Sequence, residues 1–410
     1  MDHIRLSELL FPGVTETPAD LRLRYPPRAL PEGAKVTRTA PSPTGFMHIG
    51  NLYGALADER LARQSGGVFF LRIEDTDDKR AVKGGTQEIL CVFSRFGLLF
   101  DEGAAPDGEP EKGDYGPYRQ RRRAGIYHVF AKQLVEKGLA YPCFCAPEEL
   151  AEMRARQEAE KVSPGYYGKW ARHRDMPLPE IEALLKAGRP YVLRLRSPGD
   201  PAKRITVDDL ARGKLSMPEN DQDIVLLKSD GIPTYHFAHV VDDHLMGTTH
   251  VVRGEEWLAT LPVHIQLFSA LGLKPPKYLH TPAMMKLDGA SRRKLSKRKD
   301  PEAALSYYDR QGYDPDAVLE YLMTVLNSNF EDWRRTNPDA GFREFPFSPK
   351  KIPASGALFD LDKLNDVSKN YIARLSAEEV YARALVWTAE YDPTLHEILS
   401  ADEQYAIGVF

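Results

Sequence analysis

The sequence predicts an α/β protein in which a doubly wound parallel sheet is interrupted by an inserted α/β domain and followed by a mainly helical region. Strand-like and helical segments alternate with short links over residues 36–97, the alternation breaks over 117–232, and it then resumes. Strand, helix and strand in short succession are typical of parallel strands joined by helical crossovers. At 410 residues the chain has room for about two to four domains.

Four segments predict the first half of the sheet. VTRTA (36–40) and VFFLRIED (68–75) are short and rich in β-branched or bulky residues, and the second is apolar on both faces, as a buried parallel strand would be. Residues 51–67 have leucines near helical spacing before a glycine pair, and 86–97 are also helical in pattern. Each predicted strand is therefore followed by a helix.

The sheet pattern is predicted to return within 222–257, at DIVLLK, PTYHFAHVVDD and THVVRGEEW, before the helix LATLPVHIQLFSALG. Residues 286–300 (KLDGASRRKLSKRKD) hold seven Lys or Arg and two Asp, a net charge of +5. Their Gly-Ala-Ser step predicts a flexible basic loop. Further helices are predicted around 301–326 and 376–407.

These segments predict six regions along the chain. They are an N-terminal extension without clear periodicity (1–35), the first half of the sheet domain (36–116), an inserted connective domain (117–232), the second half of the sheet domain (233–287), a domain that carries the basic KLSKR loop (288–375), and the start of a helical domain expected to be incomplete (376–410).

Composition limits the classes of function. A net charge of −4 is too small for general attraction to nucleic acid, so any such contact must come from local patches. No apolar run is long enough to cross a bilayer, and the N-terminus lacks the basic-then-apolar pattern of a signal peptide. Three cysteines make a poor disulfide framework. We therefore expect a cytoplasmic protein with free thiols.

The loop PSPTGFMHIGN (41–51) follows the first predicted strand and opens a helix. Ligands of open parallel sheets bind beyond the carboxyl ends of the strands. Gly45 and Gly50 allow close backbone approach, the helix start presents free N–H groups that suit phosphate, and His48 adds a donor. The alternative is a plain strand-to-helix loop capped by His48.

Two other segments favour a ligand-binding site over a plain loop. A lysine of KLSKR (294–298) could neutralise charge on a polyphosphate, although a solvated basic loop has the same composition. Arg38 and Glu74 both lie near carboxyl ends of predicted strands, and Arg72 shares a face with Glu74. Arginine suits a carboxylate and glutamate an ammonium, so this rim fits a zwitterion, whereas a structural Arg–Glu pair is the alternative.

Together these residues resemble the class I aminoacyl-tRNA synthetases. HIGN resembles their HIGH signature and KLSKR their KMSKS signature, in the same order. RTAPSPTGFMHIGN, LRIEDTD, GPYRQ and VVDDHLMGTTHVVRGEEW resemble the glutamyl-tRNA synthetases, over about residues 36–375. The resemblance implies a Rossmann-type catalytic domain with an inserted acceptor-binding domain, a stem-contact domain and an anticodon-binding domain.

The resemblance also implies site residues. For the glutamate substrate they are Arg38, Ala40, Ser42, Glu74, Tyr235, His239 and Arg253; for ATP they are His48, Gly50, Asn51, Glu256, Trp257, Leu295 and Lys297; and for catalysis they are His48, Gly50, Asn51, Lys294, Ser296 and Lys297. Two positions depart from many relatives: Asn51 stands where they have His, and His239 stands where some have Asn.

The implied reaction is the ATP-dependent ligation of L-glutamate to tRNA-Glu, with Mg²⁺ on the phosphates. Whether tRNA-Gln is also charged stays open, and a monomer without a membrane partner is expected. RQRRRAG (119–125) is either a tRNA phosphate contact or a solvated helix start. The alternative functions are a truncated paralogue that glutamylates a modified tRNA base and an inactive tRNA-binding relative.

Zinc is not expected. CFC, with Cys143 and Cys145, resembles the first half of a zinc site found in some members of the family. His173 is displaced from the expected second half, and four ligands at suitable spacing are missing.

Overall fold

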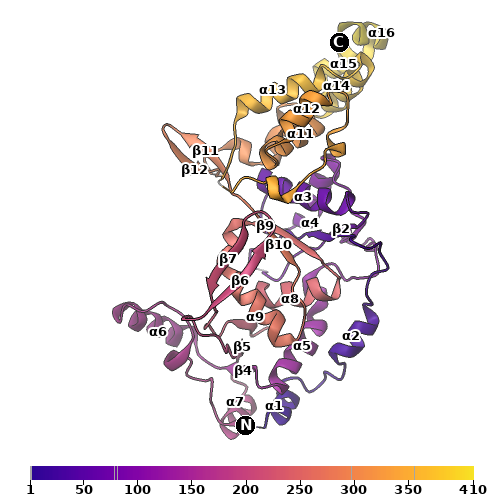
Figure 1. The fold of residues 1–410 in the computed structure, drawn as a ribbon. Helices are drawn as coiled ribbons and strands as arrows, with labels where there is room; N and C mark the ends of the chain where they lie inside the picture. Colours follow the sequence, from indigo (N-terminus) through magenta and orange to yellow (C-terminus); the bar gives the residue numbers. More distant parts are fainter. Residues whose placement is uncertain (1, 78, 81, 297, 355) are drawn as a thin grey trace.

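The computed structural model describes residues 2–77, 79–80, 82–296, 298–354 and 356–410. The molecule is elongated, with the first helix at one end, the C-terminal helices at the other and the sheets between them (Figure 1). Within the described residues, no helix is both long and apolar enough to cross a membrane.

The predicted parallel α/β sheet is confirmed. Strands β1 (Val36–Thr39), β2 (Val68–Leu71) and β3 (Glu102–Gly103) lie parallel in that order, and Arg38 pairs with Phe70. Helices α3 (Ile49–Arg63) and α4 (Gly85–Arg95) follow β1 and β2, as the alternation predicts. β2 ends four residues earlier than expected, so Arg72 and Glu74 lie just beyond it.

A second sheet continues beside the first. Its strand order is β7–β6–β10–β9, with β6 (Arg204–Asp209), β10 (Lys277–Thr281) and β9 (His250–Gly254) parallel and β7 (Gly213–Pro218) antiparallel. The Thr249 N–H donates to the Val36 carbonyl at 3.0 Å, which joins the start of β9 to β1. The carboxyl ends of β1 and β9 therefore meet at one edge.

A small antiparallel sheet lies in the predicted inserted segment. It contains β4 (Ala140–Cys143), β5 (Val192–Leu195) and β8 (Val225–Leu227), with α5 (Ala124–Glu136), α6 (Pro147–Ala159) and α7 (Leu178–Lys186) around it. The β6–β7 hairpin also comes from this segment, but it extends the sheet of β10 and β9. The predicted domain boundaries stay predictions.

The prediction of a strand at PTYHFAHVVDD is wrong, because residues Tyr235–Leu245 form helix α8. Thr234 is the N-cap residue, and the buried apolar side chains recur at helical spacing, at Phe237, Val240, Val241 and Leu245. At the start of this segment Tyr235 and Phe237 alternate with His236 and Ala238, and over only four residues such a pattern fits a strand as well as a helix. Helix α9 (Leu261–Leu271) follows, as predicted.

The basic loop is also more ordered than predicted. β11 (Met284–Asp288) and β12 (Ser291–Lys294) form an antiparallel hairpin in which Asp288 pairs with Ser291. The Gly-Ala step that predicted flexibility is the two-residue turn of this hairpin, and Gly289 has a φ of +60°. Lys294 ends β12.

The N-terminal extension, expected to lack periodic structure, forms helices α1 (His3–Leu10) and α2 (Pro18–Arg24). Thr17 and Asp20 form a capping box at the start of α2. Leu6, Leu10 and Leu21 are buried in one apolar cluster with the α5 side chains. These helices are too short for a clear period, so the sequence did not reveal them.

The remaining helices are α10 (Leu305–Arg310), α11 (Pro315–Leu326), α12 (Phe330–Thr336), α13 (Leu361–Ile372), α14 (Ala377–Tyr391), α15 (Pro393–Ala401) and α16 (Glu403–Val409). The short strand β13 (Ala357–Leu358) pairs in parallel with β11. Core residues of α11 and α3 belong to one apolar cluster, so the helical region packs directly on the sheet domain.

Gly67→Ala is expected to destabilise the sheet domain. A β-carbon at Gly67 would lie 1.9 Å from the Lys35 carbonyl oxygen, which is backbone and cannot turn aside. We expect a loss of about 1–3 kcal/mol, measured as a lower midpoint of thermal unfolding.

The matched control is Gly125→Ala in α5, where no described atom of another segment lies within 4 Å of the added carbon. This change should be neutral or slightly stabilising. Equal midpoints for the two variants would contradict the close approach at Gly67.

Candidate active site

A cavity of about 450 Å³ lies where the carboxyl ends of β1 and β9 meet. Its wall is built from segments that are far apart in the chain. It brings together most of the residues predicted for the site: Arg38, Ala40, Ser42, His48, Gly50, Asn51, Glu74, Tyr235, Arg253, Glu256, Trp257, Lys294 and Leu295.

Two of the predicted residues that the structure describes, His239 and Ser296, do not line this cavity. His239 is fully buried behind it, where its Nε2 lies 3.1 Å from the Tyr278 hydroxyl and its Nδ1 lies 2.7 Å from Asp243. In this structure His239 therefore lies behind the cavity wall, and its assignment to the glutamate site stays a prediction. Ser296 lies just outside the lining, and its N–H donates to Asp300 at 2.9 Å. Lys297 lies outside the described residues.

The start of α3 forms one side of the cavity. His48 is the N-cap residue, and its backbone N–H donates to Asn51 Oδ1 at 3.1 Å. A β-carbon at Gly50 would lie 2.9 Å from the His48 ring, so glycine lets that ring lie close to the helix start. Asn51 therefore caps the start of α3, and its own N–H donates to the His48 carbonyl at 2.8 Å. The N–H groups before it in the first turn have no partner within the helix.

A buried carboxylate, Asp243 on α8, lies between the side chains of Arg38 and Arg72. It accepts hydrogen bonds from Arg38 Nε at 3.2 Å and from Arg72 Nη1 at 2.7 Å. Arg72 also donates to Glu74 at 3.1 Å, so these two side chains meet although both lie beyond the end of β2. Burial would raise the pKa of Asp243, but Arg38 and Arg72 outweigh it and hold the pKa well below its ordinary value.

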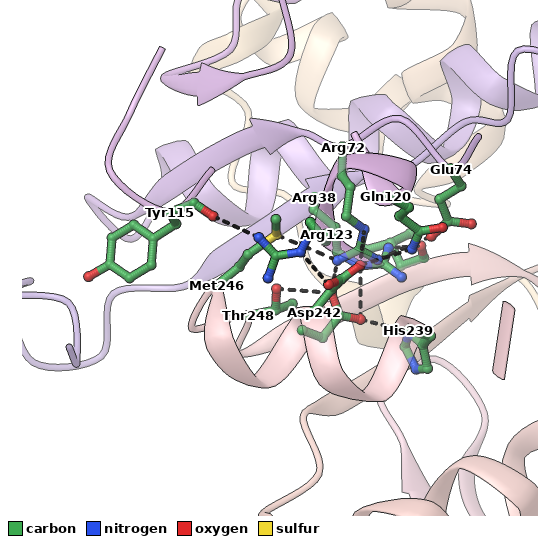
Figure 2. A network of polar contacts seen from close by, with 12 residues as sticks. Arg38, Arg72, Glu74, Tyr115, Gln120, Arg123, His239, Asp242, Met246 and Thr248 are labelled. Carbon is green, nitrogen blue, oxygen red and sulfur yellow. Dashed lines mark hydrogen bonds and ion pairs between the residues drawn. The ribbon is translucent and has the colours of Figure 1, made fainter. Parts of the chain in front are cut away.

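The neighbouring Asp242 is the second anion of this network (Figure 2). It accepts from Arg123 Nε at 2.6 Å, from Gln120 at 3.0 Å and from the Tyr127 hydroxyl at 2.8 Å. Arg123, one of the four arginines of RQRRRAG, is fully buried in this pair. That arginine is therefore structural and is not available for a tRNA phosphate.

The two arginines of the cavity wall differ in charge balance. Arg38 is paired with Asp243, whereas no described carboxylate lies within 4.0 Å of the Arg253 guanidinium. Glu74 supplies an anion to the wall, and burial raises its pKa, with Arg72 opposing the shift. This part of the wall therefore offers Arg253 as a cation without a described carboxylate partner and Glu74 as an anion partly compensated by Arg72.

Sequence analysis missed Tyr53 and Asp58, which also line the cavity. Asp58 is 2% exposed, and burial raises its pKa well above the ordinary value despite nearby Arg38. A signal was present in the sequence, because position 58 lies seven residues after Asn51 and so on the same helical face.

A second group of metal-ligand types lies in the inserted segment. The donor atoms of Cys143, Cys145 and His173 all lie within 4.8 Å of one another, and the Tyr166 hydroxyl is 3.3 Å from the Cys143 sulfur. His173 Nδ1 already accepts the Phe144 N–H at 3.0 Å. This is a three-ligand set plus a phenol, which does not complete the usual four Cys and His ligands of structural zinc.

Comparison with known proteins agrees with this geometry. The model of the family "tRNA synthetases class I (E and Q), catalytic domain" matches residues 35–337. The glutamate–tRNA ligase of Acetivibrio thermocellus is 57% identical over 99% of this chain and 74% of its own length, and that of Clostridium perfringens is 51% identical over 100% and 75%. A glutamate–tRNA ligase from Elizabethkingia meningosepticum, solved in complex with its amino acid, matches with a TM-score of 0.76 and 32% identity over 91% of this chain and 77% of that one.

A parallel sheet with a cavity lined by the HIGN helix start and by Lys294 at the end of a hairpin is the catalytic domain of a class I aminoacyl-tRNA synthetase. Within that class, the chain belongs to the glutamate–tRNA ligase family.

Asp243→Asn is expected to destabilise the protein strongly, because it leaves Arg38 and Arg72 buried without their anion. We expect a loss of about 3–5 kcal/mol, measured by thermal or denaturant unfolding. The control is Asp230→Asn, which removes a half-exposed partner of Lys228 at 3.5 Å and should change stability by about 0–1 kcal/mol. A loss no larger than that of the control would argue against the network's structural role.

The purified protein is expected to contain less than one zinc per chain. The measurement is elemental analysis of protein prepared without chelator, with Cys145→Ser as the comparison. One equivalent of zinc in the unaltered protein that disappears in Cys145→Ser would show that the prediction is wrong.

Proposed function

We propose that this chain ligates L-glutamate to tRNA-Glu with ATP, through a glutamyl-adenylate. The observation that supports this most directly is a single cavity whose lining contains a helix start of the kind that binds phosphate, Lys294, and the separate charges of Arg253 and Glu74. The first set suits a triphosphate and the second suits a zwitterionic amino acid with an anionic side chain.

Glutamate is proposed to place its side-chain carboxylate at Arg253 and Arg38 and its ammonium at Glu74. Arg38 is shared with Asp243, so Arg253 carries the larger part of the charge recognition. If glutamine were bound instead, the Arg253 guanidinium would be buried without an anion. That cost should make the site reject glutamine strongly. Tyr235 and Trp257, whose rings lie 4.3 Å apart between centroids, close the adjoining wall.

ATP is proposed to lie along α3, with its phosphates at the first turn and Lys294 above them. The free N–H groups and positive dipole end of the helix favour phosphate oxygens. Lys294 ends β12, so the hairpin carries its ammonium to the cavity edge. The resemblance assigns Glu256 and Trp257 to the adenosine side, and both line the cavity.

The first step is attack of the glutamate α-carboxylate on the α-phosphorus of ATP. A new P–O bond forms, the bond to the bridging oxygen breaks, and pyrophosphate leaves with the electron pair. The carboxylate is already ionised at neutral pH, so the chain supplies position and charge rather than a base. Correct positioning of reactants can be worth about 7–11 kcal/mol.

Mg²⁺ is expected to accompany ATP. The described carboxylates that line the cavity belong to Asp58, Glu74 and Glu256, and the first two are buried. Such a wall fits a Mg²⁺ that takes most of its oxygens from the triphosphate rather than from a protein cage. When bound, the ion adds positive charge at the phosphate oxygens.

In the second step, the 2′-hydroxyl of the terminal tRNA adenosine accepts the acyl group and AMP leaves. The inserted domain is proposed to bind the acceptor end, with the helical region along the rest of the tRNA. Whether tRNA-Gln is also charged stays open, and a monomeric state and a cytoplasmic location stay predictions. The two alternative functions, a paralogue that glutamylates a modified tRNA base and an inactive tRNA-binding relative, both predict that the terminal adenosine of tRNA receives no glutamate.

One assay tests the proposal: charging of tRNA-Glu, tRNA-Gln and tRNA-Asp with labelled glutamate by the full chain. We expect ATP-dependent acylation of tRNA-Glu that is lost on treatment with mild base. Labelling of tRNA-Asp in place of tRNA-Glu would support the base-modifying paralogue, and binding of tRNA without labelling would support the inactive relative.

Arg253→Ala is expected to lower kcat/KM for glutamate about a hundred-fold, since it removes one partner of a buried charge pair. The KM for ATP should change little. The measurement is glutamate-dependent pyrophosphate exchange with tRNA present, and Arg204→Ala, an exposed arginine on β6, is the control. Unchanged glutamate use in Arg253→Ala would refute the assignment.

A further inference from the structure

The contacts that hold Arg253 are unusual because all are uncharged. Its Nε donates to His280 Nε2 at 2.9 Å, and its Nη1 lies 3.0 Å from His264 Nδ1. Its Nη2 reaches the Trp257 carbonyl at 3.4 Å, and the guanidinium carbon lies 4.9 Å from the centre of the Tyr278 ring. Buried arginines elsewhere in this wall are held by carboxylates instead.

We infer that His264 and His280 are positioning residues that hold Arg253 as an uncompensated cation for the side-chain carboxylate of the substrate. Two imidazole acceptors satisfy the guanidinium hydrogen bonds without supplying negative charge. A carboxylate in either place would pair with Arg253 and compete with the substrate. This inference rests on the proposed function.

The fold sets the geometry of His280. Arg253 on β9 and His280 on β10 are direct partners in the parallel register, and β6 lies on the other side of β10. Asp209 on β6 lies 2.7 Å from His280 Nδ1 and also accepts the His280 backbone N–H at 3.1 Å. The proton of His280 is thereby placed on Nδ1, which leaves Nε2 as the acceptor that faces Arg253.

His264, on α9, approaches Arg253 from the other side. Its Nδ1 accepts from Arg253, so its Nε2 carries the proton and faces His236 Nδ1 at 3.0 Å. Both positioning histidines are completely buried. Burial lowers the pKa of each, and the charge of Arg253 adds to the effect, so both rings stay neutral at physiological pH.

The test compares three changes at His264 in the full chain, with glutamate, ATP and tRNA-Glu as substrates. His264→Asp supplies a carboxylate, His264→Leu removes the acceptor, and His264→Asn keeps a neutral acceptor at the Nδ1 position. We expect the KM for glutamate to rise about ten-fold or more in His264→Asp and in His264→Leu, and to stay within about three-fold in His264→Asn. The KM for ATP should stay within about two-fold in all three.

The ratio of kcat/KM for glutamate over glutamine separates charge from packing. It should fall most in His264→Asp, because the new carboxylate neutralises the cation that distinguishes the two substrates. His280→Leu and His280→Gln repeat the comparison on the other side of Arg253 if His264→Asp does not fold. His250→Asn is the matched control, since His250 lies on β9 but its Nδ1 faces Thr249 at 2.8 Å.

The outcomes distinguish this inference from the proposed function. If the unaltered chain does not charge tRNA-Glu, the proposed function fails. If it charges tRNA-Glu and His264→Asp keeps its glutamate KM and its selectivity over glutamine, the positioning role is wrong. Equal effects of His264→Asn and His264→Leu, with the ATP KM raised in parallel, would show packing alone and would also overturn it.

Discussion

The buried carboxylate of Asp243 is the constraint on which the site depends. Asp243 lies on α8 and accepts hydrogen bonds from Arg38 in β1 and from Arg72 just beyond β2. A single anion therefore joins three elements from both halves of the sheet domain. Two guanidinium groups could not be buried at this position without it. The same contacts fix where Arg38 and Glu74 face the cavity, so stability and substrate geometry share one interaction.

The arginines in the cavity wall and directly behind it are therefore of two kinds. Those near Asp242 and Asp243 are neutralised and hold the architecture, whereas Arg253 is held by neutral rings and keeps its charge. An enzyme that selects an anionic side chain needs the second kind, because a cation already paired with a carboxylate gains little from another. The charge of Arg253 therefore stays available to the substrate because its neighbours, His280 on β10 and His264 on α9, are neutral.

Much of this architecture could be predicted because its signals are local. The order of β1, α3, β2 and α4 follows from short-range periodicity, and thirteen of the predicted site residues line one cavity because they sit at strand ends and helix starts. The errors have two causes. Helix α8 and the β11–β12 hairpin were missed because short stretches of sequence fit more than one local pattern, and α1 and α2 are too short for a clear period. The contacts of His264 and His280 with Arg253 join segments far apart in the chain, and no spacing in the sequence reveals them.

The most direct measurement is a crystal structure of the chain with a non-hydrolysable glutamyl-adenylate analogue. The account predicts the adenylate phosphate at the first turn of α3, between His48 and Lys294, with the side-chain carboxylate within hydrogen-bond distance of Arg253. A phosphate bound away from α3, or a side-chain carboxylate that contacts neither Arg253 nor Arg38, would contradict it.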